Sequence, residues 1–151
     1  MVLLILGVIS YFAATRLFTD DGISRVSEMD LIKNHLRYAQ SRAMNTETNW
    51  GIMFEPPAKY WLYFDDSSNN KIIVRLPGDD TSTDKKMTLK TLSINSISNA
   101  LSSNDVKFFS GASDKVSNKP GEFGSPGTSM DISINTTAGT IKVTRHTGFI
   151  P

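Results

Sequence analysis

The sequence contains no cysteine, so the chain can form no disulfide, no thiolate nucleophile and no thiolate metal site. Histidine is scarce as well, because His35 and His146 are the only two. A catalytic triad or a zinc site would have to use one of them. We therefore expect that the protein is not an enzyme and has no cofactor.

Neither sign of charge is in excess, because 16 lysine and arginine residues face 15 aspartate and glutamate residues. A formal net charge of +1 produces no global field that would attract a polyanion, which disfavours a strongly basic nucleic-acid binder. A length of 151 residues suits one ordinary domain with an appendage. The hydrophobic content of 39% and the many serine, threonine and asparagine residues predict a small core in a strand-rich chain.

The chain opens with an apolar run that carries no charge before Arg16. This run is shorter than the roughly 20 residues that a membrane-spanning helix needs. It begins at Met1 without the basic stretch that opens a secretory signal peptide. Two interpretations remain: a buried core helix, or a spanning helix whose beginning is missing.

A second, amphipathic helical segment is predicted for residues 26–45, where apolar residues recur at steps of three and four. The apolar stripe consists of Val26, Met29, Ile32, Leu36, Ala39 and Ala43. Between the two helical segments, Thr19 to Gly22 predicts a kink or short break, because glycine costs about 1 kcal/mol in a helix interior. The stripe is expected to pack on the protein's own sheet.

From Trp50 onward the apolar period changes to that of β-strands. Strands are predicted over residues 50–54, 60–64, 71–76, 87–94, 106–109, 130–135 and 140–145, the last two forming a hairpin around Gly139. Glycines and prolines predict a long loop over residues 110–128. The expected fold class is α+β, with a long helix over residues 1–45 and an antiparallel, β-rich head over residues 46–151. Within the helix, residues 1–18 form the apolar part and residues 26–45 the part that packs on the head.

The end of the helix, Leu36-Arg-Tyr-Ala-Gln-Ser-Arg-Ala43, passes directly into a strand at Trp50. Together with the closing hairpin, this order resembles type IV pilin-like proteins, and within them the minor pseudopilins of the H type and related minor pilins. Their helix commonly closes with a leucine and an Ala-x-Ser/Arg-x-Ala segment, which Leu36 and Ala39 to Ala43 match. The segment from Gly139 to Gly148 is similar to the closing strand of the family. The resemblance implies a pilin-like fold, in which a long helix precedes an antiparallel sheet or sandwich.

The resemblance implies a structural subunit of a type II secretion pseudopilus or a type IV pilus. The implied partners are other pilin or pseudopilin subunits, assembly platform proteins and the bacterial inner membrane, with a single membrane pass and the head in the periplasm. Family members begin with a basic leader, a cleavage-site glycine and an early glutamate, so we expect further residues ahead of Met1. The implied membrane and filament residues are Val2, Leu3, Leu4, Ile5, Leu6, Val8, Ile9 and Phe12. The residues implied to pack on the head are Met29, Ile32, Leu36, Ala39 and Ala43.

An alternative function is DNA uptake, because some minor pilins bind DNA through a basic C-terminal segment. Lys142, Arg145 and His146 lie in such a segment, which contains no acidic residue. Two fixed charges provide little affinity for phosphate, so ordinary charges at a strand end are the simpler interpretation.

Other candidate sites have simpler interpretations. Asp79, Asp80 and Asp84 lack the spacing of a calcium loop, which favours a solvated turn. The glycines between residues 121 and 127 indicate a loop rather than a phosphate cradle. His35, next to the apolar stripe, is expected at the boundary of the core. Strand alternation places Tyr60, Leu62 and Phe64 on one face and Trp61 and Tyr63 on the other, so one set is expected in the core and the other is free to face a partner.

Overall fold

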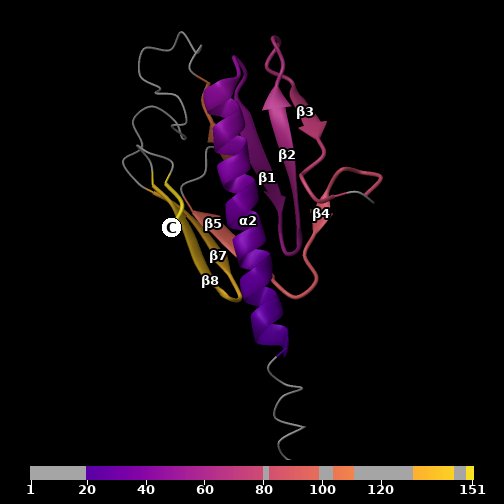
Figure 1. Ribbon diagram of the computed structural model, residues 1–151, viewed down its shortest axis with the longest axis vertical. Helices are drawn as coiled ribbons and strands as arrows, with labels where there is room; N and C mark the ends of the chain where they lie inside the picture. Colours follow the sequence, from indigo (N-terminus) through magenta and orange to yellow (C-terminus); the bar gives the residue numbers. More distant parts are fainter. Residues whose placement is uncertain (1–19, 80–81, 99–103, 111–130, 145–148) are drawn as a thin grey trace, which may run out of the picture.

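The computed structural model describes residues 20–79, 82–98, 104–110, 131–144 and 149–151. In these residues a long helix is followed by short strands in two antiparallel sheets, as Figure 1 shows. The elements are α2 (Asp20–Asn45), β1 (Trp50–Glu55), β2 (Lys59–Asp65), β3 (Lys71–Val74), β4 (Met87–Thr88), β5 (Ile94–Ser98), β6 (Asp105–Phe108), β7 (Ile132–Thr136) and β8 (Gly139–Val143). The α+β class predicted from the sequence, a helix followed by antiparallel sheets, is confirmed.

Helix α2 runs without interruption from Asp20 through Gly22, so the short break predicted as one alternative does not occur at these described residues. A helix of 26 residues tolerates one glycine, because each further turn adds hydrogen bonds once the helix is nucleated. Thr19 and the predicted helix over residues 1–18 lie outside the described residues. The last carbonyls of α2 are capped by side chains: Asn45 Nδ2 donates to the Ser41 carbonyl at 2.7 Å, and Thr46 Oγ1 donates to the Arg42 carbonyl at 2.7 Å.

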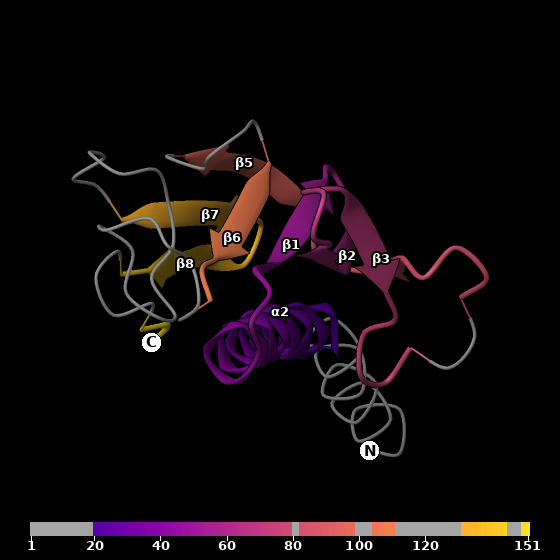
Figure 2. The same cartoon turned by 90° about the horizontal axis from the view of Figure 1, so that it is seen from above.

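The larger sheet has the strand order β3-β2-β1-β6. The short strand β4 pairs with the first residues of β2, while β3 pairs with the later residues of the same strand. The antiparallel register sets Ile52 opposite both Leu62 and Val106, so three apolar side chains lie side by side on one face. Helix α2 covers this face. Figure 2 shows the helix below β1, with β7 and β8 to one side and β3 to the other.

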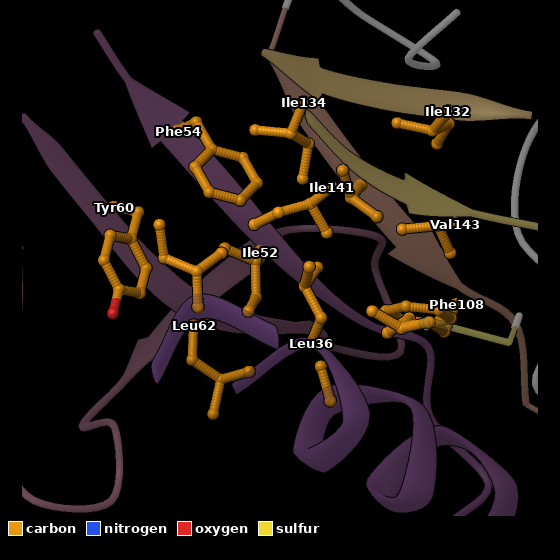
Figure 3. Packing of buried hydrophobic residues seen from close by; sticks show 14 of the residues in the cluster. Leu36, Ile52, Phe54, Tyr60, Leu62, Phe108, Ile132, Ile134, Ile141 and Val143 are labelled. Atoms are coloured by element: carbon orange, nitrogen blue, oxygen red, sulfur yellow. The ribbon is translucent and has the colours of Figure 1, made fainter. Parts of the chain in front are cut away.

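The smaller sheet has the order β5-β7-β8, and β7 and β8 form the hairpin predicted around Gly139. Gly139 adopts φ +147, a conformation that glycine accepts without strain. Isoleucines and a valine from β7 and β8 meet Leu36 of the helix and Phe54 and Phe108 of the larger sheet in one apolar cluster, as Figure 3 shows. The two sheets therefore share one core with α2.

The strand predicted over residues 87–94 is wrong, because the chain forms two separate strands there. Met87–Thr88 joins the larger sheet as β4, whereas Ile94 opens β5 in the smaller sheet. Leu89 and Leu92 are buried between them, which explains the continuous apolar pattern. The strand is interrupted because the amides of residues 90–92 donate to Glu28 of the helix instead of a neighbouring strand. Most of the loop predicted over residues 110–128 lies outside the described residues.

Candidate functional site

Helix α2 packs on the head through one side. Ile32, Leu36, Ala39 and Ala43 are fully buried, and Met29 is partly buried against the same cluster. These five residues are the ones that the sequence assigned to the helix–head contact. The helix makes most of its sheet contacts with β1, and the small side chains of Ala39 and Ala43 allow the two backbones to approach.

Val26 does not belong to this stripe, because half of its surface is exposed. Val26 and Ile32 are six residues apart, which places Val26 about 120° around the helix axis from the buried Ile32. Ile23 is more exposed still, at 66%. Every residue from 21 to 27 is exposed, whichever way it points, so the first two turns of the described helix extend beyond the head (Figure 1).

Glu28 marks the point where the projecting end meets the head. Its carboxylate accepts hydrogen bonds from the amides of Lys90 at 2.9 Å, Thr91 at 3.1 Å and Leu92 at 2.7 Å, and from the Thr91 hydroxyl at 3.1 Å. Burial opposes ionisation of Glu28, but these hydrogen bonds outweigh it and lower the pKa of the carboxyl group. The sequence analysis missed this contact, since the partners are more than 60 residues away and no local pattern indicates it.

His35 is 3% exposed, so its expected place at the boundary of the core is wrong. It lies only about 60° around the helix from Ile32 and about 40° from Ala39, a spacing that was visible in the sequence. Its Nδ1 atom is 3.0 Å from the Tyr60 hydroxyl and its Nε2 atom 3.1 Å from the Pro77 carbonyl. Burial lowers the pKa of His35, partly opposed by the bond to Pro77.

The aromatic residues of β2 do not divide into a buried and a free face. Tyr60 and Leu62 are fully buried toward the helix, and Phe64 is partly buried against the same core. Tyr63 points to the other face and is also fully buried, so it is not free to face a partner. Trp61 is partly buried beneath Lys86, whose Nζ lies 4.2 Å from the ring centroid.

A buried carboxylate on the same face of the sheet holds the Tyr63 side chain in place. Its hydroxyl donates to Asp105 Oδ1 at 2.6 Å, and Lys71 Nζ reaches the other oxygen of Asp105 at 2.6 Å. Asp65 forms an ion pair with Lys107, although its Oδ2 atom has no hydrogen bond of acceptable geometry. Both carboxylates are 4% exposed and both are paired with lysine, as buried charges must be. This cluster joins β2 and β3 to β6 across the far face of the sheet.

The turn with the three aspartates is only partly solvated. Asp79 is buried, which contradicts the expectation, and its carboxylate accepts hydrogen bonds from the Ser82 amide at 3.1 Å and the Ser82 hydroxyl. Asp84 accepts from the Lys86 amide at 3.3 Å, and Asp80 lies outside the described residues. Within the described ranges, no group of three or more histidine, aspartate and glutamate side chains could hold a metal ion.

The candidate DNA-binding residues are placed only in part. Lys142 is exposed on β8 opposite Ser133, while Arg145 and His146 lie outside the described residues. Beyond this segment the chain returns to the helix, where Arg37 donates to the Ile150 carbonyl at 2.8 Å. Ile150 itself is buried in the core.

A polar hollow of about 340 Å³ lies at the end of the larger sheet where β1 begins and β2 and β6 end. It is lined by Glu47, Thr48, Asn49, Asp65, Asp66, Ser67, Asn69 and Ser110. Asp66 already accepts hydrogen bonds from the amides of Ser68 and Asn70, which close the turn. The Ser110 hydroxyl donates to the backbone carbonyl of Glu47 at 3.2 Å.

In the part of the chain that the structure describes, no helix is long and apolar enough to cross a membrane. The membrane and filament residues predicted between Val2 and Phe12 lie outside that part. No family model, curated protein or solved structure matches this chain. The pilin-like interpretation therefore remains a prediction from the residues.

Proposed function

We propose that this chain is a structural subunit of a pilin-like filament, a minor pseudopilin of a type II secretion system or a minor pilin of a type IV pilus. In this proposal the apolar run anchors the chain in the bacterial inner membrane, with the head in the periplasm. Assembly then transfers the run into a bundle of equivalent helices. Its partners are other pilin or pseudopilin subunits and the assembly platform.

The observation that carries the proposal is the projection of α2 beyond the head. Residues 21–27 are exposed on every side, although Ile23 and Val26 among them are apolar. Exposed apolar side chains at a helix end that no other element covers favour a contact with a partner, which the described head does not provide. The apolar run of residues 1–15 precedes this end in the sequence, and in this proposal the two together form the part of the chain that contacts the membrane and the neighbouring subunits.

The chemistry of the described head also favours a structural role. Polar side chains of the head pair with groups on other elements: Glu28 with the amides of residues 90–92, His35 with Tyr60, and Asp105 with Tyr63 and Lys71. Each pair joins different elements of the fold. Their arrangement therefore holds the helix and the strands together, which is the requirement of a subunit.

The proposal is tested with Leu6→Arg in the full chain, expressed in a bacterial strain that lacks its own copy. A charge at the middle of a spanning helix costs about 2.5–3.5 kcal/mol on insertion scales, so membrane association and filament or secretion yield should be lost. Ile72→Arg is the matched control, because Ile72 is an exposed apolar residue of the head, 42% accessible on β3. Wild-type yield from Leu6→Arg would overturn the proposal.

The alternative, a DNA-binding minor pilin, is tested in the same strain. Replacing Lys142 and Arg145 by alanine should leave filament or secretion yield unchanged if the role is structural, since exposed charges at a strand end contribute little to a fold. DNA binding by the wild-type chain is measured at two salt concentrations. Salt-sensitive binding that disappears in the double variant would favour the alternative.

A further inference from the structure

The segment between β4 and β5 presents three consecutive backbone amides, those of residues 90–92, to one carboxylate. The two oxygens of Glu28 are bound separately. Its Oε1 atom accepts a hydrogen bond from the Lys90 amide at 2.9 Å. Its Oε2 atom accepts from the Leu92 amide at 2.7 Å, and from the amide and the hydroxyl of Thr91 at 3.1 Å each. The donors therefore match a group with two oxygens in one plane, which is the shape of a carboxylate.

Hydrogen bonds that do not involve helix α2 hold this segment in place. Both bonds go to the turn between β1 and β2, one from each side of the three amides. The Leu89 amide donates to the Ala58 carbonyl at 2.7 Å, and the Ile94 amide donates to the Pro57 carbonyl at 2.7 Å. The side chains of Leu89 and Leu92 are also buried. The direction in which the amides point is therefore fixed by the head itself.

We propose that residues 90–92 form a preformed binding site for a carboxylate, and that Glu28 is the ligand that the chain itself supplies. Consecutive backbone N–H groups that converge on one point bind anions. Here the donors belong to the head, whereas the ligand belongs to the helix. A movement of the projecting helix end away from the head would vacate the site and open it to a carboxylate from another molecule. The proposal does not depend on the filament function.

Acetate is the matched probe for this site. The group that Glu28→Ala removes, CH₂–COO⁻, has the same non-hydrogen atoms as acetate. Acetate can therefore fill the space that the side chain vacates, and the same amides and hydroxyl can bind its two oxygens. In the wild-type chain the helix holds Glu28 beside the donors, so its effective concentration there exceeds that of free acetate. Acetate should therefore bind to Glu28→Ala and not to the wild type.

The test uses the full chain in detergent micelles at pH 7, with acetate replacing chloride at constant ionic strength. The melting temperature of Glu28→Ala should rise with acetate concentration and then saturate, because the ligand binds only the folded state. The NMR signals of the amides of residues 90–92 should shift along the same saturation curve. Asp30→Ala, which removes an exposed carboxylate from the same helix, is the matched control and should show no saturable change. Adding Thr91→Val to Glu28→Ala should weaken acetate binding severalfold, because it removes the hydroxyl donor.

Three results would overturn the proposal. The first is a Glu28→Ala chain in which the amide signals of residues 90–92 do not respond to acetate. The second is an equal response of the wild type or of Asp30→Ala, which would indicate a general salt effect. The third is failure of Glu28→Ala to fold without acetate, because a preformed site keeps its shape when it is empty.

Discussion

Tyr63 of β2 lies across Gly51 of β1, and a Cβ atom at position 51 would come within 2.6 Å of the Tyr63 hydroxyl oxygen. The absence of a side chain at residue 51 lets the tyrosine ring lie flat over β1. From there its hydroxyl reaches Asp105 on β6, one strand further on. Glycine at this position is thus required by the space that the ring occupies.

The first prediction follows from this contact. Gly51→Ala should displace Tyr63 and weaken its bond to Asp105, reducing the free energy of unfolding by about 1–3 kcal/mol. Gly22→Ala is the control, because nothing lies within 4 Å of a Cβ atom there, and it should raise helix stability by about 1 kcal/mol. Urea denaturation of both variants measures the difference. Equal stability of Gly51→Ala and the wild type would show that the ring moves without cost.

The second prediction concerns the buried side of the helix. Leu36→Asp should unfold the head, because Leu36 is fully buried and an unpaired charge in a core costs several kcal/mol. Leu31→Asp, at a leucine of the same helix that is 36% exposed, should retain the fold. Circular dichroism during thermal unfolding distinguishes the two. A cooperative transition of Leu36→Asp at the wild-type temperature would contradict the packing described here.

The third prediction concerns Glu28. Glu28→Gln should lower the free energy of unfolding by about 1–3 kcal/mol, because charge-assisted hydrogen bonds to three amides become weaker. Asp30→Asn is the control, since the Asp30 side chain is 58% exposed and pairs with neighbouring Lys33 at 3.6 Å. Exposed pairs of this kind contribute little. Chemical denaturation at neutral pH should separate the two variants, and equal effects would count against the Glu28 contact.

The pH dependence of the same contact gives a fourth prediction. The folded state lowers the pKa of Glu28 below its ordinary 4.5, so its contribution to stability is present above that value. As the pH falls through the folded pKa, this contribution should disappear. The difference in unfolding free energy between wild type and Glu28→Gln should therefore shrink on acidification from pH 6 to pH 3. A difference that stays constant over this range would refute the assignment.

The sequence predicted features that depend on periodicity. The buried stripe from Met29 to Ala43, the first two strands and the hairpin at Gly139 all follow from spacing within a short segment. Val26 was misplaced because the helix extends beyond the head at residues 21–27, where every side chain is exposed whichever way it points. The single strand predicted at residues 87–94 was wrong because Leu89 and Leu92 are buried without belonging to a strand, so their apolar pattern indicated burial and not strand pairing.

The polar contacts could not be predicted, since each joins residues that are distant in the chain. Glu28 and its amide partners are more than 60 residues apart, and Tyr63 and Asp105 are 42 apart. His35 differs, because its angular distance from Ile32 and Ala39 already placed it on the buried side. Alternation placed Tyr63 on the correct face, but the expectation that this face is free to meet a partner was wrong for Tyr63, because paired charges on the same face cover it.

The Glu28 contact sits at the boundary between the projecting turns of α2 and the part that is seated on the head. A pull or twist applied at the projecting end is transmitted first to this carboxylate. Four donor groups of three consecutive residues in the segment between β4 and β5 hold it: the amides of residues 90–92 and the Thr91 hydroxyl. The apolar contacts of Ile32 and Leu36 lie further along the helix, on the C-terminal side of Glu28. Glu28 is therefore the first polar contact with the head that a load on the projecting end would meet.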